Sequence, residues 1–119
     1  MLIQKLTAHW VERYGSAEVR KWFFEVWNEP NLQAFWTGSQ DDYFRLYRCT
    51  VAAIRSVDES LKVGGPATAD NQWIPQFLDY CKKNSVPVEF VSTHHYPTDA
   101  FGRPGADTVT QLERARAES

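Results

Sequence analysis

Hydrophobic residues recur along this chain in two patterns, one spaced as on the face of a helix and one gathered into short runs. The first pattern predicts helices at residues 6–22, 39–60, 71–85 and 108–119. The second pattern, rich in β-branched and aromatic residues, predicts strands at residues 22–27, 61–67 and 88–97. Glycine and proline are expected to end the second strand within its GGPA stretch and the third strand at Pro97.

Two of the predicted helices carry clear positional signals. In residues 6–22, a single apolar stripe is formed by Leu6, Trp10, Val11 and Tyr14. In residues 39–60, Ser39 suits the N-cap position, and two aspartates come after it where the helix dipole favours negative charge. The buried face of this second helix is predicted to hold Tyr43, Tyr47, Val51 and Ile54.

Alternation of helices with strands predicts an α/β fold built from parallel βαβ units, with strands buried on both faces. Two architectures fit this order, an open doubly wound sheet and part of a (β/α)8 barrel. No glycine-rich phosphate loop is present, because GGPA has neither the dinucleotide nor the P-loop spacing. Both architectures place an active site at the carboxyl ends of the strands, which here are NEPN, GGPA and HHYPTD.

Composition narrows the class of protein further. The chain has 119 residues, enough for one domain, with 43% hydrophobic and 24% charged residues and a net charge of -2. That charge gives no reason to expect nucleic acid or an anionic membrane as a partner, and no apolar run is long enough to cross a bilayer. The amino terminus has no signal-peptide pattern, and the compartment is not readable. Nothing calls for a cofactor or a metal, and Cys49 and Cys81 are both expected to be buried helix residues.

The stretch FFEVWNEPN holds two carboxylates, Glu25 and Glu29. In a regular strand they share one face but lie about 13 Å apart, since each residue adds about 3.3 Å. Retaining glycosidases need carboxylates about 5–5.5 Å apart and inverting ones about 6.5–9.5 Å. We therefore expect different roles for the two acids, with Glu25 a structural acid that needs a partner on a neighbouring strand.

Glu29 suits general acid chemistry, because aromatic residues flank it and burial favours the neutral form of a carboxyl group. Asn28 beside it has a donor and an acceptor for a substrate hydroxyl. The alternative is that NEPN is only a turn that ends the strand, and residue spacing alone favours that alternative.

Around these residues the sequence resembles glycoside hydrolase family 39, the β-xylosidase family. WFFEVWNEPNLQAFW is similar to the family's acid/base strand, and YFRLYRCTVAAIRSVDESLKVGGPA and FLDYCKKNSVPVEFVSTHHY are similar to the family's stretches C-terminal to that strand. The resemblance implies that residues 1–119 are one segment of a (β/α)8 catalytic barrel, with strands four to six. It also implies a retaining glycosidase that acts on a xyloside or a related oligosaccharide.

The resemblance further implies roles for individual residues. Glu29 matches the general acid/base, Asn28 the residue that contacts the sugar 2-hydroxyl, and His94 and Tyr96 residues that line the sugar site. Period-2 alternation independently places Ser92, His94 and Tyr96 on one face of a strand. Trp36, with Phe35, is expected either to form a wall of the sugar site or to pack the loop onto the barrel rim.

The family's nucleophile is a glutamate that ends the seventh strand, and no residue here matches it. We therefore expect the isolated chain to be inactive, and a non-catalytic carbohydrate-binding or degenerate remnant is the alternative reading. A related barrel acting on another sugar is a further alternative. Unpaired edges of a three-stranded sheet lead us to expect self-association.

Overall fold

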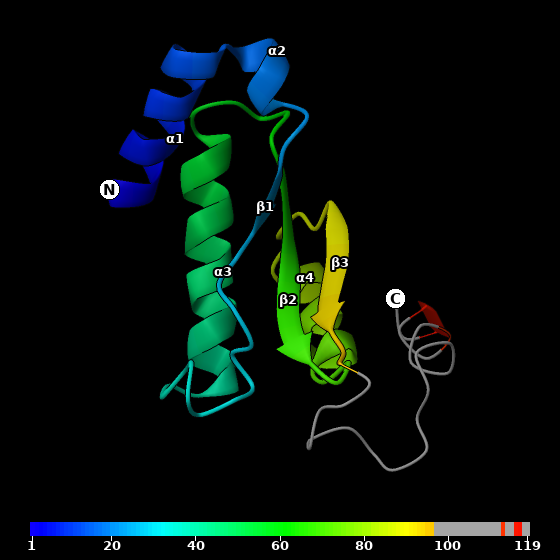
Figure 1. The fold of residues 1–119 in the computed structure, drawn as a ribbon. Helices are drawn as coiled ribbons and strands as arrows, with labels where there is room; N and C mark the ends of the chain where they lie inside the picture. The colour runs from blue at the N-terminus through cyan, green and yellow to red at the C-terminus, as the bar shows by residue number, and fades with distance from the viewer. Residues whose placement is uncertain (97–112, 114–115, 118–119) are drawn as a thin grey trace.

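The structure is a computed structural model that describes residues 1–96, 113 and 116–117. Three parallel strands form one sheet in the order β1-β2-β3, and their bounds are Phe23–Glu25, Lys62–Ala69 and Phe90–His94 (Figure 1). The predicted α/β class with a parallel sheet is therefore confirmed. The helix predicted at residues 108–119 falls largely outside the described residues.

Four helices are described, with the bounds Leu2–Tyr14 (α1), Ser16–Val19 (α2), Gln40–Arg55 (α3) and Ile74–Lys83 (α4). The single helix predicted at 6–22 is divided in two at Gly15, whose φ of 83° lies in the left-handed region. Ser39 caps α3 as predicted, since its hydroxyl accepts from the Asp42 amide and the Asp42 carboxylate accepts from the Ser39 amide. None of the described helices is long and apolar enough to cross a membrane.

The apolar stripe predicted for the first helix is only partly correct. Trp10 and Val11 pack against the core, but Leu6 is 42% exposed and Tyr14 is 49% exposed. The reason is that α1 packs mainly against α2 and α3 and reaches the sheet through Trp10, whose ring stacks on Phe24 of β1, so Leu6 and Tyr14 have little cover among the described residues.

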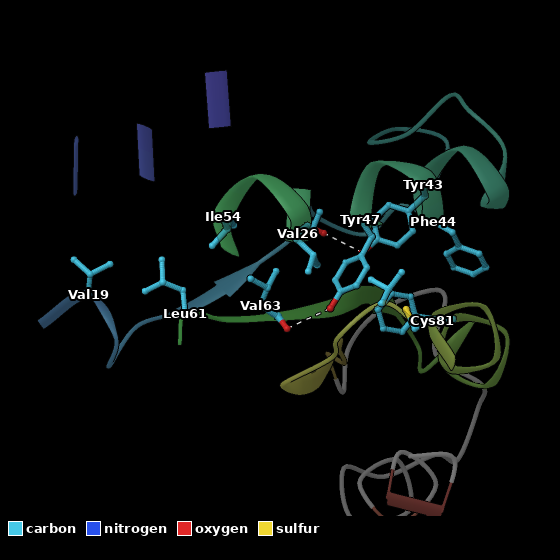
Figure 2. Close-up of a cluster of buried hydrophobic side chains, with 12 residues drawn as sticks. Val19, Val26, Tyr43, Phe44, Tyr47, Ile54, Leu61, Val63 and Cys81 are labelled. Carbon is cyan, nitrogen blue, oxygen red and sulfur yellow. Dashed lines mark hydrogen bonds between the residues drawn. The ribbon is translucent and has the colours of Figure 1, made fainter. Parts of the chain in front are cut away.

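The core lies between the sheet and the helices α3 and α4 (Figure 2). Burial of its large side chains is worth about 1.5–3 kcal/mol each. The Tyr43 hydroxyl is shared between the carbonyl oxygens of Val26, at 3.0 Å, and Pro66, at 2.9 Å. Burial raises the pKa of this phenol, so the hydroxyl stays a donor that joins α3 to the ends of β1 and β2.

The two cysteines differ in environment. Cys81, on α4, is buried in the core as predicted, whereas Cys49 is exposed on α3. The prediction for Cys49 is wrong because it falls beside Arg48, on the side of α3 that faces solvent. Both thiols are free.

The second strand does not end at GGPA as predicted, but continues to Ala69. Proline has no backbone N–H, so Pro66 removes one hydrogen-bond donor from this central strand. The pairing of β2 with β3 changes register between Pro66 and Thr68. The Gly65–Pro66 peptide is cis. The carboxyl end of the strand therefore lies three residues beyond Pro66, next to the loop after β1.

The two faces of the sheet differ. One face meets the helices, because the atoms nearest to Gly65 on that side belong to Tyr43, Tyr47 and Phe77. On the other side, Phe23 is 62% exposed and contacts Phe90 ring to ring at 5.3 Å. We call this second side, with Phe23, Glu25, Lys62, Phe90 and His94, the open face. The prediction that all strands are buried on both faces is thus wrong for β1 and for β3, whose residues are all half-buried, whereas β2 is almost wholly buried.

Candidate active site

The chain leaves the regular strand conformation directly after β1. Trp27 and Glu29 have φ angles of 70° and 43°, in the left-handed region that non-glycine residues seldom adopt. Such residues cost about 1–3 kcal/mol each and gather at functional sites. The Glu29 amide donates to the Ala67 carbonyl at 2.8 Å, so this irregular segment still runs beside β2. The bend moves Glu29 away from the position that a straight strand would give it.

Asn31 fixes the end of this segment to β2. Its side-chain amide donates to the Ala69 carbonyl at 3.1 Å, and its side-chain oxygen accepts from the Ala69 amide at 2.8 Å. From the sequence, Glu29 was predicted to be the acid and Asn28 to contact the sugar, with a simple turn as the alternative, and Asn31 was given no role. The signal was present, because the short amide side chain of Asn can both donate to and accept from a backbone.

Glu29 and Glu25 meet at one imidazole. The carboxylate oxygen Oε1 of Glu29 lies 3.0 Å from Nδ1 of His94, and Oε1 of Glu25 lies 3.7 Å from Nε2 of the same ring. The two oxygens are therefore much closer than the 13 Å expected for a straight strand, because β1 ends at Glu25 and the chain then bends. The partner expected for Glu25 is His94, which lies on β3 beyond the adjacent strand.

Burial differs across this group. The side chain of Glu29 is 13% exposed, that of His94 is 26% exposed and that of Glu25 is 37% exposed. Glu29 is thus the most enclosed of the three, in agreement with the partial burial predicted from its aromatic surroundings. The His94 ring fills the space between the carboxylates, which leaves no room there for a sugar ring.

A pocket of about 240 Å³ is lined by Trp27, Asn28 and Phe35, residues that come shortly before and after Glu29 in the sequence. The Trp27 indole donates to the Phe35 carbonyl at 3.0 Å, which fixes one aromatic wall. Drug-sized ligands occupy pockets of about 300–1,000 Å³, so this smaller one suits a single small ring. Asn28 is exposed and is the polar side chain of the lining, one residue from Glu29.

Trp36 and Tyr96 are less closely tied to the pocket. Trp36 packs edge-on against Trp27 and Tyr43, at 5.9 and 6.3 Å, and its indole donates to the Ser39 carbonyl. It supports the pocket wall from behind, which favours the rim-packing alternative. Tyr96 is 62% exposed, and no hydrogen bond of the described residues joins it to Glu29 or His94.

The end of β2 completes the edge of the sheet. The Asp70 amide donates to the His94 carbonyl at 2.9 Å, and the Thr93 hydroxyl donates to the Thr68 carbonyl at 2.8 Å. These contacts hold β3 beside β2 at the level of His94. Within residues 1–96, 113 and 116–117, no group of three His, Cys, Asp or Glu side chains has a geometry suited to a metal ion.

Comparison with known proteins gives consistent matches. The family model described as "Glycosyl hydrolases family 39" matches residues 1–118. A "Beta-xylosidase" of Caldicellulosiruptor saccharolyticus is 52% identical over 120 residues, and one of Geobacillus stearothermophilus is 50% identical over 102 residues. A solved structure of a "GH39 Beta-xylosidase from Caulobacter crescentus" superimposes with a TM-score of 0.88 at 47% identity.

The coverage of these matches is unequal. The Caldicellulosiruptor match covers 99% of this chain but 24% of that protein, and the Geobacillus match covers 83% and 20%. The Caulobacter structure matches 98% of this chain and 25% of its own. The chain thus spans about a quarter or less of each relative.

Proposed function

The chain belongs to glycosyl hydrolase family 39, and from this we propose that it carries the acid/base half of the active site of a retaining glycosidase of the β-xylosidase type. In this proposal β1, β2 and β3 are strands four to six of a (β/α)8 barrel, and residues 1–119 are one segment of that catalytic barrel. The substrate is a xyloside or a related oligosaccharide, as the names of the relatives suggest.

The observation that carries the proposal is the environment of Glu29. This carboxyl group lies at the carboxyl edge of a parallel sheet, is mostly enclosed and hydrogen-bonds an imidazole, and Asn28, the residue before it, lines an aromatic pocket. In retaining hydrolysis a general acid protonates the leaving oxygen and the same residue later activates water. Glu29 has the position and the proton-exchanging neighbour that both steps need.

Other residues take supporting roles. Asn28, in the lining of the pocket, contacts the sugar 2-hydroxyl. His94 holds Glu29, and Tyr96 lines the sugar site on the same side as His94. Trp36 stiffens the indole of Trp27 and so shapes the pocket wall.

The nucleophile is a carboxylate other than Glu25. Retaining enzymes hold a sugar between two carboxyl groups about 5–5.5 Å apart. Here the space between Glu25 and Glu29 is taken by His94, so Glu25 cannot be the partner of Glu29 across a substrate.

A segment exchange tests the proposal. Residues 1–119 replace the matched segment of the 52% identical Caldicellulosiruptor β-xylosidase, which supplies the remainder of its own chain. We expect the hybrid to hydrolyse p-nitrophenyl β-xyloside. Glu29→Gln should lower the rate by about 10²–10⁴-fold, the usual contribution of a general acid.

The matched control is Glu59→Gln, which alters an exposed glutamate in the turn after α3 and should leave the rate unchanged. Xylobiose, with its poor leaving group, should suffer more from Glu29→Gln than the p-nitrophenyl substrate does. A Glu29→Gln hybrid with full activity on xylobiose would refute the assignment.

A further inference from the structure

We propose that Glu25 is a positioning residue that keeps a proton on Nε2 of His94, so that His94 exchanges protons with Glu29 only through Nδ1. The proposal rests on the proposed function, since it specifies the proton path of the same acid/base residue. It gives a role in the chemistry to an acid that sequence analysis assigned to structure.

The geometry divides the two ring nitrogens between the two carboxylates. Nδ1 faces Glu29 at 3.0 Å, which is a hydrogen bond, and Nε2 faces Glu25 at 3.7 Å, which is an ion-pair distance. Each nitrogen therefore has its own acidic neighbour. Flipping the ring would exchange carbon and nitrogen positions and break the Glu29 contact.

Hydrogen-bond chemistry then selects the tautomer. An ionised carboxylate only accepts, so an imidazole nitrogen facing it is favourable when it carries hydrogen and unfavourable when it presents a lone pair. In histidine, the partner of one ring nitrogen sets the protonation of the other. When Glu29 carries its acid proton, its O–H donates to Nδ1, so the ring hydrogen lies on Nε2, the nitrogen that faces the more exposed Glu25.

The resulting proton path is simple and balanced. When Nδ1 is bare, it accepts a hydrogen bond from the carboxyl O–H of Glu29. When the proton moves across this bond, the O–H bond of Glu29 breaks, an N–H bond forms at Nδ1, and Glu29 becomes a carboxylate. His94 thus holds a proton on Nδ1, which lies 3.0 Å from Oε1 of Glu29, without any change in ring orientation.

The fold explains how Glu25 reaches a ring two strands away. Glu25 is the last residue of β1 and pairs with Gly64 of β2, and Phe90 of β3 fills the space that a side chain at position 64 would take. His94 is fixed on the other side, since its carbonyl accepts from the Asp70 amide.

Two further charged groups lie on the neighbouring strand and the loop after it. Lys62, on β2, has its ammonium 4.7 Å above the ring of Phe23, and Asp70 comes directly after the end of β2. His95 and Tyr96 come directly after His94 on the chain. In the described part of the chain, the ion-pair contacts of His94 are with Glu25 and Glu29 alone.

Nitrogen-15 NMR of the full 119-residue chain tests the proposal without any activity measurement. Histidine-labelled protein carries three imidazoles, and His9→Gln and His95→Gln variants assign the signals of His94. Across the pH range in which the chain is folded, Nε2 of His94 should keep the shift of a protonated nitrogen while Nδ1 changes. A wild-type Nε2 that loses its proton before Nδ1 overturns the proposal outright.

Two variants separate Glu25 from Glu29. Glu25→Gln offers Nε2 a donor as well as an acceptor, so the ratio of neutral Nε2–H to Nδ1–H tautomers should fall about tenfold or more. Glu29→Gln should leave Nε2 protonated. The reverse result, with the tautomer controlled by Glu29, contradicts the proposal even if the hydrolysis experiment succeeds, and amide spectra verify that each variant is folded.

Discussion

The side chain of Asn31 makes two hydrogen bonds with the backbone of Ala69, a residue 38 positions further along the chain. It accepts from the Ala69 amide and donates to the Ala69 carbonyl, as a neighbouring strand would do. The side chain thus extends the pairing of β2 at the point where the backbone after β1 has left the sheet. Glu29 lies two residues before this attachment.

Replacement of Asn31 by alanine should therefore destabilise the chain. Two hydrogen bonds are lost and two backbone groups of a buried residue lose their partner, so we expect the free energy of unfolding to fall by about 1–3 kcal/mol. Urea unfolding measures this change. Asn84→Ala is the control, because the Asn84 side chain makes one exposed bond, to the Tyr80 carbonyl, and its loss should have a smaller effect.

Stability should also depend on pH through Cys81. Burial raises the pKa of its thiol to about 11, whereas an unfolded thiol has a pKa near 8.5. The stabilisation is therefore fully present below about pH 8.5 and is lost as the pH rises towards 11. Unfolding free energies at pH 7.5 and pH 10 should differ less in Cys81→Ala than in the wild type.

Cys49→Ala provides the comparison for that measurement, since it removes an exposed thiol and should retain the pH dependence of the wild type. The buried phenols of Tyr43 and Tyr47 remain in every variant, and because the Cys81 charge helps to raise the pKa of both, Cys81→Ala also reduces their alkaline contribution, in the same direction. An equal pH dependence in Cys81→Ala and the wild type would contradict the expectation.

The open face of the sheet predicts self-association of the 119-residue chain. Phe23 is 62% exposed there, and the described helices lie on the opposite side of the sheet. Light scattering over a dilution series should show oligomers at high concentration, and Phe23→Ser should shift the equilibrium towards monomer. Tyr14→Ser, which removes a similarly exposed aromatic from α1, should have little effect, and a wild-type chain that stays monomeric throughout contradicts the idea.

Local sequence signals accounted for most of the fold. Ser39 and its aspartates located the start of α3, and the spacing of Tyr43 and Tyr47 gave its buried face. These signals depend only on residues three or four positions apart, so they can be recognised in the sequence without the tertiary structure. The continuation of β2 through Pro66 was missed because it depends on the hydroxyl of Tyr43 and on a register irregularity, both of which are long-range.

Two residues of the candidate site, Glu29 and His94, lie in contact, but the arrangement around them could not be predicted from the sequence. Glu29, Asn28 and His94 were identified from strand ends and family resemblance. The contact of Glu25 and Glu29 with the same ring of His94 was not predicted, because a regular strand was assumed to continue through Trp27. A tryptophan gives no sign in the sequence that its backbone will be left-handed. Positive φ angles at such residues are imposed by surrounding contacts.

Gly64 of β2 lies against Phe90 of β3, and the Phe90 ring contacts Phe23 of β1. A Cβ atom there would lie 2.3 Å from the Phe90 carbonyl oxygen, and the rings of Phe23 and Phe90 meet above it. Positions 23, 64 and 90 therefore share one fixed space, although β1 and β3 are not neighbours in the sheet. Since the nearest obstacle to a side chain at position 64 is the backbone carbonyl of Phe90, no change of side chain at position 23 or 90 removes it, and variants selected for function should keep glycine at position 64.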